Sequence, residues 1–85
     1  MRILILGGDG MLGHQLRARL APRHDVRVTL RRPLESYESL GLFHTDNAYG
    51  GIELRTTDSL RPVLAAFGPE AVINAAGIVG RRQLS

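Results

Sequence analysis

Four segments of this 85-residue chain show the hydrophobic patterns of β-strands. Residues 3–6 and 71–77 are short, almost wholly apolar runs, as in strands covered on both faces of a parallel sheet. Residues 25–30 and 52–56 alternate between apolar and polar side chains, which indicates strands with one face less covered. The segment 52–56 is the shorter of these two, and we expect it nearer an edge of the sheet.

An amphipathic pattern between the first two predicted strands indicates a helix over residues 14–21. Its apolar positions recur at helical spacing and form a single buried stripe. Pro22 follows directly and ends the helix. The stripe consists of Leu12, Leu16 and Leu20.

A second helix is predicted between the third and fourth strands. Asp58 or Ser59 is placed to cap its first turn, and Gly68-Pro69 stops it. Pro62 falls in the first turn, where backbone donors lack intrahelical partners in any case. The apolar stripe of this helix consists of Leu60, Val63, Leu64 and Phe67.

The segment between the second and third predicted strands is less regular. Residues 34–40 fit two helical turns that end at Gly41, whereas residues 44–51 contain the glycines and polar side chains typical of a loop. The positions expected to face inward are Leu34, Tyr37 and Leu40 or Gly41.

The order of strands and helices predicts an α/β fold. Right-handed crossovers would give a partial, Rossmann-like, doubly wound parallel sheet of about four strands in the order 3-2-1-4. Ligands of such sheets bind outside the carboxyl ends of the strands, where the strand order reverses. We therefore expect a binding crevice between the first and fourth strands, with residues 7–13 on one side and residues 74–77 on the other.

The run between the first strand and the first helix, Gly7-Gly8-Asp9-Gly10-Met11-Leu12-Gly13, is rich in glycine. A strand that turns at once into a helix presents free amides and the positive end of the helix dipole, which suit a diphosphate. The glycines permit a tight turn, a close approach of the ligand and close packing of helix on strand. The pattern GxGxxG uses Gly8, Gly10 and Gly13, whereas GxxGxxG uses Gly7, Gly10 and Gly13; both remain open, as does a tightly packed turn that binds nothing.

Arg31 and Arg32 follow the second predicted strand, at the position that meets the adenosine ribose in a dinucleotide fold. An acidic residue there accepts a hydrogen bond from the ribose 2′-hydroxyl, whereas arginine accommodates a 2′-phosphate. No Asp or Glu stands at this strand end, and Glu35 lies beyond Pro33. The residues therefore favour NADP(H) over NAD(H), with two solvated surface arginines as the alternative.

Composition excludes several other classes of protein. The net charge is +3, but the basic residues are scattered arginines, and two Phe, two Tyr and no Trp offer few rings for stacking bases. The chain has no cysteine, and His44 with Asp46 gives too few ligands for a metal. No segment approaches the length of a membrane span or resembles a signal peptide. We expect a cytoplasmic protein that binds neither nucleic acid, metal nor membrane.

Taken together, GGDGMLG after the first strand, the arginine pair after the second and VINAAG in the fourth resemble the N-terminal part of extended short-chain dehydrogenase/reductases. The stretch from Asp58 to Gly80 is similar to the branch of dTDP-4-dehydrorhamnose reductase-like enzymes, which modify sugar nucleotides. The resemblance covers essentially the whole chain. It implies an NADP(H)-binding fragment of a reductase that acts on a nucleotide-activated sugar, with NAD as the other possible cofactor.

The resemblance also implies roles for individual residues. Gly7, Gly10 and Gly13 would hold the pyrophosphate, with backbone amides from Met11 and Leu12. Arg31, or Arg32 in its place, would meet the adenosine ribose or its phosphate. Glu53 stands nearest to the position of a family Asp that touches the adenine. The residues expected to line the cofactor toward its nicotinamide end are Ala75, Ala76 and Gly77, with Asn74 steadying the strand.

The family uses a tyrosine and a lysine four residues later as its acid–base pair, and this chain contains no lysine. A free tyrosine has a pKa of about 10 and needs a neighbouring cation to act near neutral pH. Residues 1–85 are therefore expected to be the N-terminal half of a dinucleotide-binding Rossmann domain, without catalytic residues or the substrate-binding portion. A non-catalytic NAD(P)-binding sensor is the alternative, and an uncovered fourth strand predicts self-association.

Overall fold

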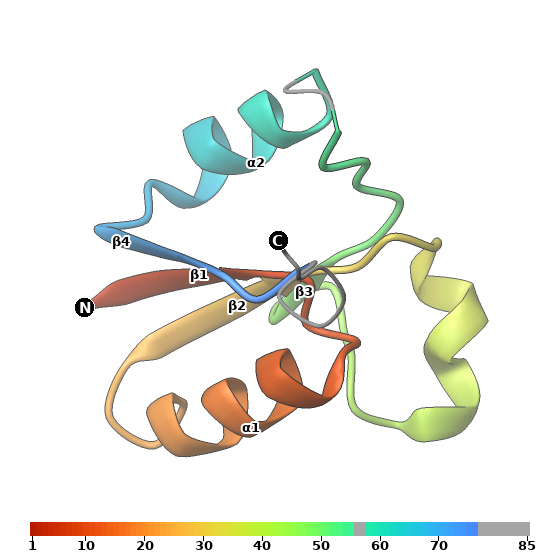
Figure 1. The fold of residues 1–85 in the computed structure, drawn as a ribbon, viewed down its shortest axis with the longest axis horizontal. Helices are drawn as coiled ribbons and strands as arrows, with labels where there is room; N and C mark the ends of the chain where they lie inside the picture. The colour runs from red at the N-terminus through yellow and green to blue at the C-terminus, as the bar shows by residue number, and fades with distance from the viewer. Residues whose placement is uncertain (56–57, 77–85) are drawn as a thin grey trace, which may run out of the picture.

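A four-stranded parallel sheet with a helix on each face forms the framework of the protein (Figure 1). The computed structural model describes residues 1–55 and 58–76. In chain order the elements are β1 (Arg2–Leu6), α1 (Met11–Leu20), β2 (Asp25–Thr29), the 3-10 helix η1 (Leu34–Leu40), β3 (Ala48–Tyr49), α2 (Leu60–Phe67) and β4 (Ala71–Asn74). None of the helices in this part of the chain is both long and apolar enough to cross a membrane.

The strand order is β3-β2-β1-β4, as the sequence predicts. β1 lies between β2 and β4 and is parallel to both, with Leu6 beside Thr29 on one side and Asn74 on the other. Because all strands run in the same direction, their carboxyl ends and the loops that follow them meet at one edge. This edge is where a ligand of a doubly wound sheet binds.

The two faces of the sheet carry separate hydrophobic clusters. The face under α1 buries Ile3, Ile5 and Val28, and the predicted stripe of Leu12, Leu16 and Leu20 packs against it. On the opposite face, Leu4 packs with Ile52, Val63 and Phe67 beneath α2. Figure 1 shows α1 and α2 on opposite sides of the sheet, which is the doubly wound arrangement.

The third strand does not lie where the hydrophobic alternation places it. β3 is Ala48–Tyr49, within the segment predicted as loop, and residues 52–55 form no strand. Gly51 has a φ of +69°, which turns the chain after β3. The amides of Gly51 and Ile52 still donate to the segment after β2, to Arg32 O and Leu30 O respectively, both at 2.9 Å. Ile52 and Leu54 alternate with polar residues because they pack beneath α2. The alternation of 52–56 thus reflects helix packing, and Thr56 lies outside the described residues.

Three smaller predictions are also wrong. Neither Leu40 nor its alternative Gly41 faces inward, since both are exposed and Tyr37 occupies the inward face of η1. Leu64 is 36% exposed, because Val63 and Phe67 occupy the inward face of α2. Ser59 stands at the N-cap of α2 but makes no capping bond, since its hydroxyl bonds to the backbone of Glu53 instead.

The apolar segment 71–77 yields a shorter strand than predicted, ending at Asn74. Ala75 continues alongside β1 by donating its amide to Leu6 O at 2.9 Å, whereas Gly77 lies outside the described residues. A wholly apolar strand is typical of the middle of a covered sheet. Within the described part of the chain β4 is instead an edge strand, and Val72 is 49% exposed.

Candidate functional site

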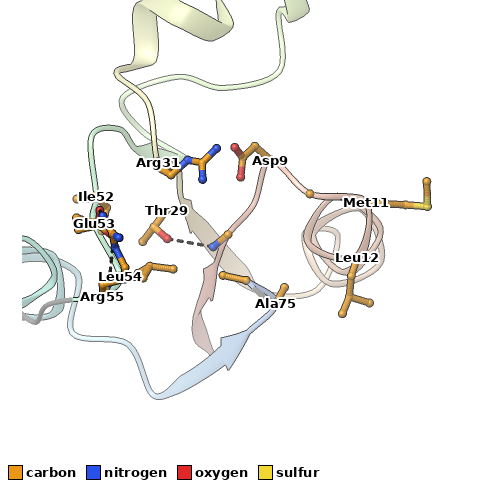
Figure 2. Close-up of a pocket in the computed structure, with 13 residues that line it drawn as sticks. Asp9, Met11, Leu12, Thr29, Arg31, Ile52, Glu53, Leu54, Arg55 and Ala75 are labelled. Carbon is orange, nitrogen blue, oxygen red and sulfur yellow. Dashed lines mark hydrogen bonds and ion pairs between the residues drawn. The ribbon is translucent and has the colours of Figure 1, made fainter. Parts of the chain in front are cut away.

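An open cleft of about 580 Å³ lies at the carboxyl ends of the strands (Figure 2). Each strand contributes the residues that follow or end it, and the start of α1 closes one side. The cleft is therefore in the place that the strand order predicts for a ligand. The residues that line it are Gly7, Asp9, Gly10, Met11, Leu12, Thr29, Arg31, Ile52, Glu53, Leu54, Arg55, Ala75 and Ala76.

The glycines of the β1–α1 loop let it lie close to α1, to β2 and to the residues that follow β4, because they carry no Cβ. Gly7 has a φ of +82°, and a Cβ there would lie 2.8 Å from the Cβ of Ala76. A Cβ at Gly13 would lie 2.4 Å from the carbonyl oxygen of Gly7, so α1 could not pack this close to the loop with any larger residue. Gly8 is needed for a different reason, because a Cβ there would overlap Val28 of β2.

The two glycine spacings left open by the sequence have different geometries. Gly7 and Gly10 line the cleft, whereas Gly8 faces the sheet and does not. Gly13 lies behind them, where α1 touches the loop. The two spacings differ only in their first glycine, and of these Gly7 lines the cleft with Gly10, whereas Gly8 packs against Val28.

The first turn of α1 presents backbone donors at the cleft. Gly10 is its N-cap and makes no side-chain capping bond, and the first turn contains no acidic residue. Within residues 1–55 and 58–76, the amides of Met11, Leu12 and Gly13 donate to no protein acceptor. Free amides at the positive end of a helix dipole fit an anion such as a diphosphate.

Thr29, at the end of β2, holds the glycine loop through two hydrogen bonds. Its hydroxyl accepts a hydrogen bond from the Gly7 amide at 3.1 Å, and its carbonyl accepts one from the Gly8 amide at 2.8 Å. The residue is only 1% exposed, so these bonds are shielded from water. Sequence reasoning missed Thr29, because the alternation of β2 groups it with the polar side chain of Arg27, whereas the structure buries its hydroxyl against the glycine loop.

Four charged side chains line the cleft, two of each sign. Glu53 and Arg55 form an ion pair at 3.0 Å, and the hydrogen bond from the Arg55 side chain is the main cause that lowers the pKa of Glu53. Arg31 and Asp9 point toward one another from opposite loops (Figure 2). Arg32, the substitute for Arg31 in the prediction, does not line the cleft.

Asp9 is held by a tyrosine from η1. The Tyr37 hydroxyl donates to Asp9 Oδ2 at 2.9 Å and accepts a hydrogen bond from the Arg32 amide at 3.3 Å. Tyr37 is 8% exposed, and burial is the main cause that raises its pKa, so the hydroxyl keeps its proton at neutral pH. The glycine loop is thereby tied to the segment that follows β2.

Most residues predicted for the site meet at the cleft. Gly7, Gly10, Met11, Leu12, Arg31, Glu53, Ala75 and Ala76 line it, whereas Gly13 and Arg32 do not and Gly77 lies outside the described residues. Met11 contributes only backbone, since its side chain is 78% exposed and points away (Figure 2). The residues that the sequence did not suggest are Asp9, Thr29, Ile52, Leu54 and Arg55.

Comparison with known proteins gives one family. The sequence model of the family described as "NAD dependent epimerase/dehydratase family" matches residues 3–85. Neither a curated protein nor a solved structure gives a significant match. The matched range includes all the residues that line the cleft.

Proposed function

The chain belongs to the NAD-dependent epimerase/dehydratase family, and on that premise we propose that its cleft binds NADP(H). The observation that carries the proposal is that Met11 and Leu12, whose amides donate to no described acceptor, line the same cleft as Arg31. A dinucleotide pyrophosphate carries two negative charges and needs donors rather than a cation cage. Its adenosine end would then lie toward the carboxyl end of β2.

The choice of NADP(H) rests on Arg31. It follows β2 and lines the cleft, so its guanidinium can form charge-assisted hydrogen bonds with a 2′-phosphate. Arg55 adds a second guanidinium, and its side chain is 88% exposed in the pair with Glu53. Exposed ion pairs contribute little to stability, so Arg55 can turn to a phosphate at little cost.

For the whole protein we propose a reductase that acts on a nucleotide-activated sugar, similar to dTDP-4-dehydrorhamnose reductase. The support is the likeness of the stretch from Asp58 to Gly80, which includes VINAAG, to that branch. Bound NADPH would supply a hydride to a sugar carbonyl. The residues described here would hold the cofactor through the α1 amides and Arg31, and protonation of the sugar oxygen would fall to residues outside this cleft.

We also propose that residues 1–85 form the N-terminal half of the dinucleotide-binding domain. β4 is almost wholly apolar, yet Val72 is 49% exposed and β4 pairs only with β1 among the described strands. Strands of this composition are covered on both faces in parallel sheets. Further strands and helices packed on β4 would give it that cover.

Titration with NADPH tests the cofactor proposal. The chain has no tryptophan, so the emission of NADPH itself can be followed without interference. Arg31→Gln should weaken NADPH binding by roughly tenfold or more, the effect of losing a hydrogen bond to a charged group, and should leave NADH binding nearly unchanged. Arg19→Gln, in the last turn of α1, removes the same charge away from the cleft and should match the wild type.

The outcomes of this titration are distinct. Absence of NADPH and NADH binding in the wild-type protein would overturn the proposal that the cleft binds a nicotinamide cofactor. Binding of both nucleotides with equal losses in the Arg31 and Arg19 variants would overturn only the preference for NADP(H).

A further inference from the structure

The carboxyl end of β2 lacks an acidic residue in the sequence but has a carboxylate beside it in space. Thr29, the last residue of β2, is followed by Leu30, Arg31 and Arg32. Asp9, from the β1–α1 loop, is brought to this position through Tyr37, which lies 28 residues later in the chain. The same hydroxyl also accepts a hydrogen bond from the Arg32 amide, so the Tyr37 oxygen joins the glycine loop to the segment that follows β2.

The carboxylate is fixed rather than free. Tyr37 is buried against Phe43, with the two rings edge to face at 5.5 Å, and its hydroxyl uses both its donor and an acceptor site. One oxygen of Asp9 receives the tyrosine proton. Asp9 itself is exposed and lines the cleft, so its carboxylate remains able to accept a second hydrogen bond from a ligand.

Asp9 and Arg31 approach the same part of the cleft from opposite loops (Figure 2). They do not form an ion pair within 4.0 Å, and the described residues contain one ion pair, between Glu53 and Arg55. Both side chains line the open cleft, so a ligand group that enters this part of it meets both of them. A hydroxyl there can donate to the carboxylate, whereas a phosphate there meets attraction from Arg31 and repulsion from Asp9.

We propose that Asp9 is the acidic residue that recognises the adenosine ribose, supplied from the glycine loop in place of the one that β2 lacks. The inference rests on the proposed function. Asp9 accepts a hydrogen bond from the 2′-hydroxyl of NAD(H) and repels the 2′-phosphate of NADP(H). Arg31 attracts that phosphate. Tyr37 is a positioning residue, since it orients the carboxylate without touching the cofactor. The balance of Asp9 and Arg31 then sets cofactor preference.

Paired titrations with NADPH and NADH test this assignment. Asp9→Asn keeps the shape of the side chain, and its amide oxygen can still accept from Tyr37, so the loop should hold its conformation. The ratio of NADPH affinity to NADH affinity should rise by roughly tenfold or more, as for loss of a repulsive charge and of one charged hydrogen bond. Asp25→Asn, at the start of β2, removes the same charge at the opposite edge of the sheet and should leave the ratio unchanged.

Tyr37→Phe separates positioning from charge. This variant keeps the buried ring and loses only the hydroxyl, so Asp9 stays charged but is no longer oriented. The affinity ratio should shift in the same direction as in Asp9→Asn but less, and adding Tyr37→Phe to Asp9→Asn should change the ratio no further. A shift of equal size on both backgrounds would overturn the positioning role.

The results also distinguish this inference from the proposed function. If the wild-type protein binds neither nucleotide, the proposed function fails and the role of Asp9 fails with it. If both nucleotides bind and Asp9→Asn gives the same ratio as Asp25→Asn, the cofactor site stands and the role of Asp9 is wrong.

Discussion

Substituting single glycines of the β1–α1 loop by alanine should separate folding from cofactor binding. Gly13→Ala places a methyl group 2.4 Å from the carbonyl oxygen of Gly7 and 2.9 Å from the Cα of Gly8. Gly10→Ala places the same group in the cleft, where the nearest atom is the Gly7 oxygen at 3.8 Å, an ordinary contact distance. The two variants therefore differ in what the methyl group meets, not in its size.

The cost of Gly13→Ala follows from the kind of atoms that it meets. Both are backbone atoms of a loop that Thr29 anchors through the Gly7 and Gly8 amides, so neither can rotate away. The start of α1 must shift by about 1 Å, and overpacking of this kind costs about 3 kcal/mol at its upper end. The higher helix propensity of alanine offsets about 1 kcal/mol of this cost. The net loss is about 2 kcal/mol, or a fall in Tm of roughly 8–16 °C.

The cost of Gly10→Ala is smaller and has another origin. Gly10 has a φ of −86° and a ψ of 167°, which alanine adopts without strain. Alanine is a poorer N-cap than glycine, and this difference amounts to about 0.5 kcal/mol. Gly10 lines the cleft and directly precedes the α1 amides, however, so a methyl group there should lower NADPH binding by roughly tenfold or more.

Urea denaturation followed by far-ultraviolet circular dichroism, together with NADPH titration, measures both effects. Gly10→Ala should denature close to the wild-type midpoint and bind weakly, whereas Gly13→Ala should be less stable and also bind weakly. If Gly13→Ala is as stable as the wild type, the close contact of α1 with the loop is wrong. If Gly10→Ala binds NADPH as the wild type does, the phosphates do not lie at the α1 amides.

Three further predictions concern stability and association. Thr29→Val removes the acceptor of the Gly7 amide and should lower the unfolding free energy by about 1–3 kcal/mol in urea titrations, with wild-type secondary structure before the transition. The Glu70 carboxylate accepts a hydrogen bond from the Arg2 amide at 2.9 Å, and this bond lowers its pKa. Its stabilisation is present above its ordinary pKa of 4.5 and is lost as pH falls through the lower folded value, so Glu70→Gln should lose less stability than the wild type on acidification. The exposed edge of β4 and its Val72 side chain should make the protein associate at tens of micromolar, roughly the concentration at which such surfaces associate. In sedimentation, Val72→Thr should run as a smaller species than the wild type. A wild-type monomer at that concentration would contradict this prediction.

The elements nearest the site were the most predictable from sequence. The run from Ile3 to Leu20 combines a buried strand, a glycine turn and a leucine stripe, and each of these local preferences agrees with the same βα unit. The third strand was not predictable in the same way. Its Ala48–Tyr49 pair has no periodicity of its own, while Ile52 and Leu54 alternate for a reason that only the packing of α2 reveals.

The acidic side of the cleft illustrates the same limit at the level of chemistry. From the sequence, an acidic residue is expected immediately after β2, and Arg31 and Arg32 stand there instead. The sequence shows which residues follow the strand, but not which residues from other loops lie beside it. The carboxylate comes instead from a loop 28 residues away from its anchor Tyr37, and the link is a single hydroxyl. A buried tyrosine on a short 3-10 helix looks like a core residue in the sequence. Its bond to Asp9 holds a carboxylate that faces Arg31, so under the proposed role of Asp9 cofactor preference would depend on a contact between segments as well as on the residue that follows the strand.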